Sequence, residues 1–160
     1  MFFWLQKQWI LWDLNRTIRR RGWTAIYVPG DEEAGGFAYT VGLRQAVGSA
    51  EIVVSNVPIE LGNGLIGAAV SQLQAGELAL ADGEAWALDW EGGAKMVWRR
   101  VHPDQIESQY FNLARWWREK TSGPDLEGFQ LVLSDLAGKL PWEDGYDPAY
   151  GRRQKALWRP

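Results

Sequence analysis

The chain has 160 residues, of which 46% are hydrophobic, so it is long enough to bury a core and is not disordered. It contains no cysteine, which excludes disulfides, thiolate nucleophiles and cysteine-ligated zinc. The net charge of −3 argues against a general nucleic-acid footprint, and no nucleic-acid partner is expected.

Charged and aromatic residues are unevenly placed. Residues 1–30 carry five basic residues and one acidic residue, whereas residues 31–95 carry two basic and ten acidic residues. The acidic middle argues against phosphate binding there. Eleven tryptophans indicate a bulky core or an aromatic-lined surface.

The start lacks the basic segment and cleavage site of a signal peptide, and we expect a cytoplasmic protein.

The N-terminal stretch is the most apolar part of the chain. Apolar residues at helical spacing predict a helix over residues 2–21, ended by Gly22. Its first half is apolar nearly all round and must be buried. We therefore expect residues 2–12 either to dock on their own domain or to contact a second copy or another protein. Attachment to a membrane surface is a less favoured alternative.

Three strands and a helix follow. β-Branched and aromatic residues predict strands at 23–28, 36–42 and 51–55, the first two antiparallel and the third in a central position. Pro58 favours the start of a helix that continues to Gly76. Glycines within this helix weaken it, and they are explained if another element packs closely on that face; they are Gly62, Gly64 and Gly67.

The second half of the chain alternates between the two kinds of element. Residues 85–90 and 95–101 read as a hairpin around 91–94, residues 103–120 as a helix, and residues 129–133 as the last strand. These elements predict an α+β fold with a largely antiparallel mixed sheet of about five or six strands and about three helices. We expect one domain over 1–160, divided into the helix at 2–21, an α+β core at 22–143 and an irregular tail at 144–160.

Several stretches occur together in the order typical of one family. On these stretches the chain resembles, over roughly residues 13–158, the bacterial domain-of-unknown-function family 4262. The resemblance implies a small soluble domain without an established activity. The chain departs from the family pattern where Leu133 and Ser134 stand in place of a Trp-Pro pair, and it lacks a cysteine-containing opening segment. The stretches are GW at 22–23, FAYTVGL at 37–43, EIVVSNVPIELGNGLIGAAV at 51–70, VHPDQIESQYFNLA at 101–114 and FQLVLSDLAGKLPWEDGYDP at 129–148.

Few residues offer catalytic chemistry. His102 is the only histidine, and no nucleophile-elbow motif accompanies any serine, so a structural role is favoured over general-base catalysis. Asp144 and Asp147 resemble a calcium loop only weakly, because the alternating ligands and the closing glutamate are missing. No phosphate-binding glycine motif occurs. We expect neither a metal nor a cofactor.

Two pairs of side chains remain as candidates. Asp135 and Glu143 flank a turn that ends in Trp142, and they are either an acid–base or ligand-binding pair or a turn cap with a solvated neighbour. Tyr39 and Thr40 lie on a strand and point to opposite faces, so at most one of them lines a given cleft.

The sequence favours a binding or interaction module with an aromatic pocket, which takes a small molecule or a protein. The alternative is a small hydrolase or transferase that uses Asp135 or Glu143 with His102 or Tyr39. The candidate pocket residues are Tyr39, Thr40, His102, Asp135, Trp142 and Glu143.

Overall fold

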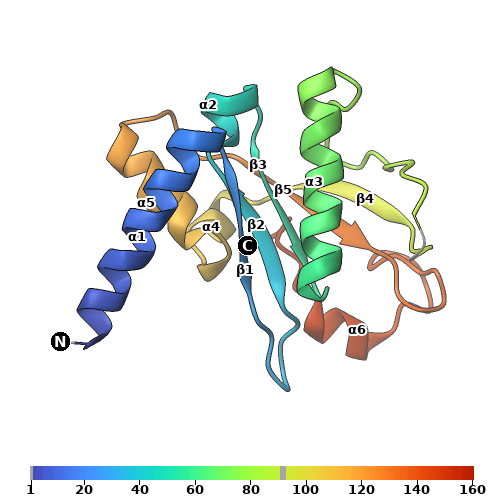
Figure 1. The fold of residues 1–160 in the computed structure, drawn as a ribbon. Coiled ribbons are helices and arrows are strands. Elements are labelled where there is room, and N and C mark those ends of the chain that lie inside the picture. The colour runs from blue at the N-terminus through green and yellow to red at the C-terminus, as the bar shows by residue number, and fades with distance from the viewer. Residues whose placement is uncertain (1, 91–92) are drawn as a thin grey trace.

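The computed structural model describes residues 2–90 and 93–160. A mixed five-stranded sheet runs through the molecule, with helices on both of its faces (Figure 1). The strand order is β1-β2-β3-β5-β4, and every neighbouring pair is antiparallel except the parallel pair β3 and β5. The predicted α+β class with a largely antiparallel mixed sheet is confirmed. The strands are β1 (Thr24–Val28), β2 (Phe37–Val41), β3 (Glu51–Ser55), β4 (Met96–Arg100) and β5 (Gly128–Leu133).

The two long helices begin and end close to where the sequence predicts them. The helix expected over 103–120 is instead divided, because the Ser108 hydroxyl donates to the Gln105 carbonyl and accepts from the Tyr110 N–H, which interrupts the helical ladder. None of the helices in the described ranges is long and apolar enough to cross a bilayer. The helices are α1 (Phe2–Arg21), α2 (Leu43–Val47), α3 (Ile59–Ala75), α4 (Pro103–Ile106), the 3-10 turn η1 (Gln109–Phe111), α5 (Asn112–Thr121) and α6 (Pro148–Arg153).

Helix α3 covers one face of the sheet (Figure 1). A side chain at Gly62 would bring its Cβ to 3.2 Å from the Cβ of Ala38 on β2, so this glycine permits the close packing that we expected. The same explanation is wrong for Gly64 and Gly67, whose added Cβ atoms would meet nothing within 4 Å. The core on this face includes Ala38, Ile52, Val54, Leu65, Ile66, Leu131 and Trp98.

Helices α1 and α5 and the turn η1 cover the opposite face. Because side chains alternate along a strand, Phe37, Tyr39 and Val41 of β2 point to this side, away from α3. They pack with Leu14 and Ile18 from the second half of α1 and with Phe111 and Ala114 near α5. Strand β3, between β2 and β5, is buried along its whole length, as its apolar run predicted.

The expected strand at 85–90 does not form. Only Ala85 makes an isolated bridge, to Val97 of β4. The Trp86 indole instead donates to Gln72 of α3 and packs on Trp98, and the Trp90 indole donates to the Ala94 carbonyl. The Trp86 indole thus holds the segment against α3. Around Ala85 its backbone still pairs with β4, because the Trp86 N–H donates to the Met96 carbonyl and the Trp98 N–H donates to the Glu84 carbonyl. The expected turn of this hairpin includes residues 91 and 92, which lie outside the described residues.

Two glutamine side chains attach the C-terminal segment to the sheet. Gln154 accepts from the Leu133 N–H and donates to the Leu133 carbonyl, both at 2.9 Å. Gln130 of β5 donates to the Lys155 carbonyl and accepts from the Leu157 N–H. The segment expected as an irregular tail therefore contains α6 and a fixed stretch whose Leu157 is fully buried.

Candidate functional site

The stretch Gly36–Leu43 holds a buried carboxylate. The Thr40 hydroxyl donates to Glu51 Oε2 at 2.5 Å, and the N–H groups of Gly42 and Leu43 donate to Glu51 Oε1 at 3.0 and 2.9 Å. Thr40 also accepts from the Ile52 N–H. Gly42 suits this turn because its φ is +99° and a Cβ there would approach the Gly22 carbonyl to 2.8 Å. The stretch therefore binds the end of β2 to the start of β3.

The pKa of Glu51 is shifted far above its ordinary value. Burial raises the pKa of Glu51 to about 7, against the opposing effect of the hydrogen bonds from Thr40, Leu43 and Gly42. Only 3% of the residue is exposed. Sequence reasoning passed over this residue, although an acidic residue at the head of a buried apolar strand was the signal.

Tyr39 and Thr40 both point into the protein. The Tyr39 hydroxyl accepts from the Leu113 N–H at 3.1 Å, which fixes the first turn of α5 against β2. Burial raises the pKa of Tyr39, so the phenol stays neutral. The two residues are exposed by only 2% and 0%, and neither hydroxyl faces an open cleft.

His102 begins helix α4. Its Nδ1 accepts from the Asp104 N–H at 3.1 Å and is the N-cap acceptor of the helix. The same nitrogen lies 3.8 Å from the Asp104 carboxylate. The His102 backbone N–H donates to the Leu157 carbonyl and so connects α4 with the C-terminal segment.

Asp135 organises the turn that follows β5. Its Oδ1 accepts from the N–H groups of Ala137 and Lys139, and its Oδ2 accepts from the Asp147 N–H, each at 2.9 Å. The Lys139 N–H, followed by those of Asp147 and Ala137, holds the pKa of this carboxyl below its usual range. Glu143 is bound in a similar way, because its Oε1 accepts from the Leu140 N–H at 2.9 Å.

Trp142 lies on the outer surface of this turn. Its ring meets the Trp158 ring edge to face, with the ring centres 5.7 Å apart. The Arg99 guanidinium of β4 lies over both rings, 4.9 Å from Trp142 and 5.1 Å from Trp158. An aromatic pair from two distant parts of the chain thus already binds a cation of the protein itself.

Beside this pair lies a concavity that we call the C-terminal hollow, about 480 Å³ in volume. It lies between the Pro141–Tyr146 turn and the Gln154–Arg159 stretch. The Tyr146 hydroxyl accepts from Gln154, and burial raises the pKa of Tyr146. The Tyr146 side of the hollow is therefore uncharged. Its lining includes Pro141, Glu143, Asp144, Tyr146, Trp158 and Arg159.

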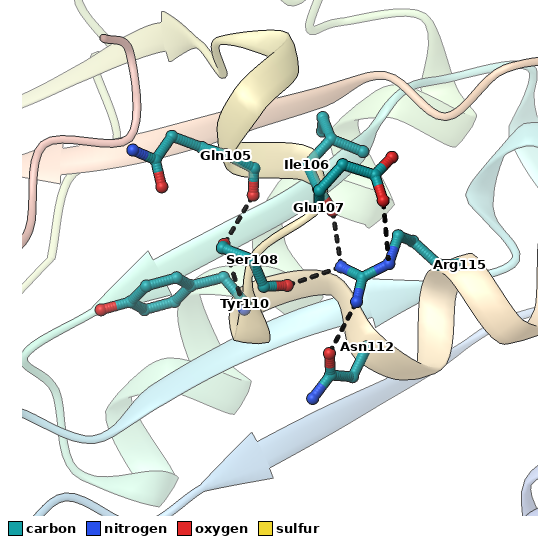
Figure 2. A network of polar contacts seen from close by, with 7 residues as sticks. All are labelled: Gln105, Ile106, Glu107, Ser108, Tyr110, Asn112 and Arg115. Carbon is teal, nitrogen blue, oxygen red and sulfur yellow. Dashed lines mark hydrogen bonds and ion pairs between the residues drawn. The ribbon is translucent and has the colours of Figure 1, made fainter. Parts of the chain in front are cut away.

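A second hollow of about 420 Å³ lies between α4, α5 and the loop before β5. Arg115, one of three arginines that line it, is bound by carbonyl and side-chain oxygens of the chain itself (Figure 2). Arg115 Nη1 donates to the carbonyls of Ile106 and Ser108 at 2.7 and 2.6 Å, and Nη2 donates to Asn112 Oδ1 at 2.8 Å. These bonds fix the α4–η1 connection and leave the guanidinium few donors for a ligand.

The structure brings three of the six candidate residues together. Asp135, Trp142 and Glu143 belong to one short stretch after β5, of which Glu143 lines the C-terminal hollow. Tyr39 and Thr40 lie in the interior, and His102 caps α4. In the described ranges, no group of three histidine, aspartate or glutamate side chains could hold a metal ion. The sequence did not indicate Tyr146 or Trp158 as site residues, and it did not pair Trp142 with Arg99.

The chain was compared with known families, curated proteins and solved structures. The family model described as "Domain of unknown function (DUF4262)" matches residues 17–147, which include the five strands and the Asp135–Glu143 turn. No curated protein and no solved structure matches the chain. Because the match covers most of the sequence, the chain belongs to the DUF4262 family of unknown function.

Proposed function

We propose that this chain is a binding domain whose ligand occupies the C-terminal hollow. The observation that carries the proposal is the combination of volume and lining. A concavity of about 480 Å³ falls in the range of small-molecule sites, roughly 300 to 1,000 Å³. Its walls combine the aromatic rings of Tyr146 and Trp158 with the carboxylates of Glu143 and Asp144.

The lining favours an organic cation. Aromatic faces attract ammonium and guanidinium groups through the ring quadrupole, and a nearby carboxylate adds direct charge attraction. The Trp158 ring already receives two guanidinium groups of the chain, Arg99 at 5.1 Å and Arg159 at 5.7 Å. Arg159 is exposed, so an incoming amine or guanidinium competes with it at the mouth of the hollow.

Binding is better supported than hydrolysis or group transfer. The carboxylates of Asp135 and Glu143 accept backbone N–H groups, and the His102 Nδ1 caps a helix. The Tyr39 hydroxyl is buried against α5 and away from these carboxylates. A nucleophile and its base need to lie within hydrogen-bond reach of each other, and these candidates are instead distributed over separate elements.

The test is a thermal-shift and calorimetric titration with butylammonium, guanidinium and tetramethylammonium chlorides. Sodium chloride and butanol at the same concentrations are the controls for ionic strength and for the apolar chain. A ligand that binds only the native state raises its stability by mass action, so at least one organic cation should give a saturable rise in melting temperature.

Two variants connect the effect to the hollow. Asp144→Asn removes an exposed carboxylate and should weaken the cation severalfold, whereas Arg159→Ala removes the competing guanidinium and should strengthen it. Glu119→Gln, on the exposed surface of α5, is the matched control and should change nothing. No saturable effect in any titration, or the same affinity in all four proteins, would sink the proposal.

A further inference from the structure

Helix α1 has two halves with different surroundings. In the second half, Leu14 and Ile18 are buried against the sheet, at 4% and 5% exposure. The first half extends away from the sheet, toward the N-terminus in Figure 1. Its large apolar side chains are exposed by 43% to 64%; they are Trp4, Leu5, Trp9, Ile10 and Trp12. The expected docking of residues 2–12 on their own domain therefore does not occur at these five residues, and the side chains of Phe2 and Phe3 lie outside the described part.

Part of this exposed surface is ordered as a stripe. Leu5, Trp9, Trp12 and Arg16 follow one another at intervals of four, three and four residues, which places them along one side of the helix. At about 100° per residue, this side points away from the side that carries Leu14 and Ile18. The same intervals define the a and d positions of a coiled-coil seam. The stripe lies before residue 17, where the family match begins.

We propose that this stripe is a homodimer interface, in which α1 pairs with α1 of a second copy in antiparallel orientation. The inference is independent of any ligand in the C-terminal hollow. A two-fold axis between Trp9 and Trp12 sets Trp9 against Trp12 of the other copy and Leu5 against Arg16. A two-fold interface uses the same patch on both subunits, and the stripe is complementary to itself in this register.

The exposed area suits this partner. Tryptophans that are 57% to 64% exposed each leave roughly 150 Å² uncovered, so Leu5, Trp9 and Trp12 on the stripe amount to on the order of 400 Å² per copy. A patch of that size on a monomeric protein is often a functional surface. Pairing two copies covers on the order of 800 Å² of apolar surface, and the two exposed Arg16 side chains add to it, so the total approaches the roughly 1,000 Å² of a specific interface.

The distribution of charge selects the antiparallel orientation. Arg19, Arg20 and Arg21 occupy the last turn of α1, close to Arg16, and its first turn contains no acidic residue. A parallel pair would bring the two arginine clusters together. An antiparallel pair separates them and lays Arg16 along the aromatic half of the other helix. Arg16 already lies over Trp12 within one copy, at 5.5 Å, so the guanidinium and indole surfaces are compatible.

The first experiment measures mass by sedimentation velocity over a concentration series. The full chain should change from monomer to dimer, and Trp9→Glu should remain a monomer because each copy would bury a charge in the seam. Gln6→Glu places the same charge on the helix beside the stripe and should still dimerise. Circular dichroism and the melting temperature of each variant show that it is folded, as expected for changes at exposed positions.

The second experiment determines orientation. Because the chain has no cysteine, single Leu5→Cys and Arg16→Cys variants report only on the introduced thiols. On oxidation, a mixture of the two variants should form the mixed disulfide in preference to either homodimer.

A folded chain that stays monomeric throughout the series overturns the interface, as does dimerisation of Trp9→Glu. Cross-linking of Leu5→Cys to itself overturns the antiparallel orientation. Monomers that instead bind vesicles of anionic phospholipid overturn the choice of partner.

Discussion

Glu51 couples the stability of the fold to pH near neutrality. Glu51 is only 3% exposed and lies at the junction of β2, β3 and α2. Its pKa is raised from 4.5 to about 7. A raised pKa means that the folded protein holds the proton more tightly than the unfolded chain does. The contribution to stability is complete below about pH 4.5 and is lost as the pH rises through about 7.

The magnitude follows from the size of the shift. One pKa unit corresponds to about 1.4 kcal/mol, so a change from 4.5 to about 7 amounts to roughly 3 kcal/mol, most of it lost between about pH 5 and pH 8. That is a large fraction of the 5 to 15 kcal/mol by which most domains are stable. The perturbation is Glu51→Gln, which removes the titration and keeps an oxygen that accepts from the Gly42 and Leu43 N–H groups.

The assay is urea unfolding of both proteins at several pH values across this interval. The free energy of unfolding of the wild type should fall by about 2 to 3 kcal/mol more than that of Glu51→Gln, because all other titratable groups are common to both and cancel. Glu119→Gln, which removes an exposed carboxylate from α5, controls for the change in net charge and should behave as the wild type.

The opposite result has a clear physical meaning. If the stability curves of wild type and Glu51→Gln run parallel within about 0.5 kcal/mol, the three hydrogen bonds to the carboxylate offset its burial and the linkage argument fails. An NMR titration of the Glu51 carboxyl measures its pKa directly and tests the same argument. In the folded wild type, the Glu51 side-chain carboxyl resonance should titrate near pH 7.

The other polar residues of these turns should affect stability in distinct ways. Thr40→Val removes the hydroxyl that donates to Glu51 and should cost about 2 kcal/mol in chemical denaturation, with Thr40→Ser recovering most of it. Tyr39→Phe leaves the Leu113 N–H without its acceptor and should cost about 1 kcal/mol; an unchanged denaturation midpoint would contradict this. Asp135→Asn should lower the melting temperature and flatten the loss of stability on acidification, since the native pKa of Asp135 is depressed and its contribution disappears as pH falls through that value.

The binding and self-association proposals act at separate places on the molecule. The C-terminal hollow is formed by residues 141–159, and the stripe lies on the first four turns of α1. Trp9→Glu should therefore leave cation binding unchanged, and Asp144→Asn should leave dimerisation unchanged. Loss of both properties in one variant would mean that the variant is unfolded, which its circular dichroism spectrum would reveal.

Local features were predicted well because their causes are local. The apolar spacing of residues 2–21 and the glycine that follows suffice to define α1, and the β-branched runs define β1, β2 and β3. The helix after Arg100 was predicted as continuous because periodicity alone does not register a competing serine. Ser108 interrupts it by bonding to backbone groups three residues before it and two after.

Of the candidate site, the sequence indicated the turn at Asp135–Glu143, since aspartate, glycine and proline carry recognisable turn chemistry. It could not pair Trp142 with Trp158 and Arg99, because β4 and the C-terminal segment meet only in the folded chain. The turn-cap alternative for Asp135 anticipated bonds to backbone N–H groups, but it expected Glu143 to be solvated and so missed the bond from the Leu140 N–H. Such bonds depend on where the loop ends after the sheet has formed.

The sequence by itself determined the α+β class, the two long helices and the positions of the five strands, although it also predicted a strand at 85–90 that does not form. These features follow from side-chain periodicity and from glycine and proline geometry, which act over a few residues. Tertiary structure alone decided the parallel pairing of β3 with β5, the burial of Glu51 with its hydrogen bond from Thr40, and the exposure of the α1 stripe. The free energy of a buried charge or an uncovered indole depends on which distant segments surround it, and only the folded chain determines that.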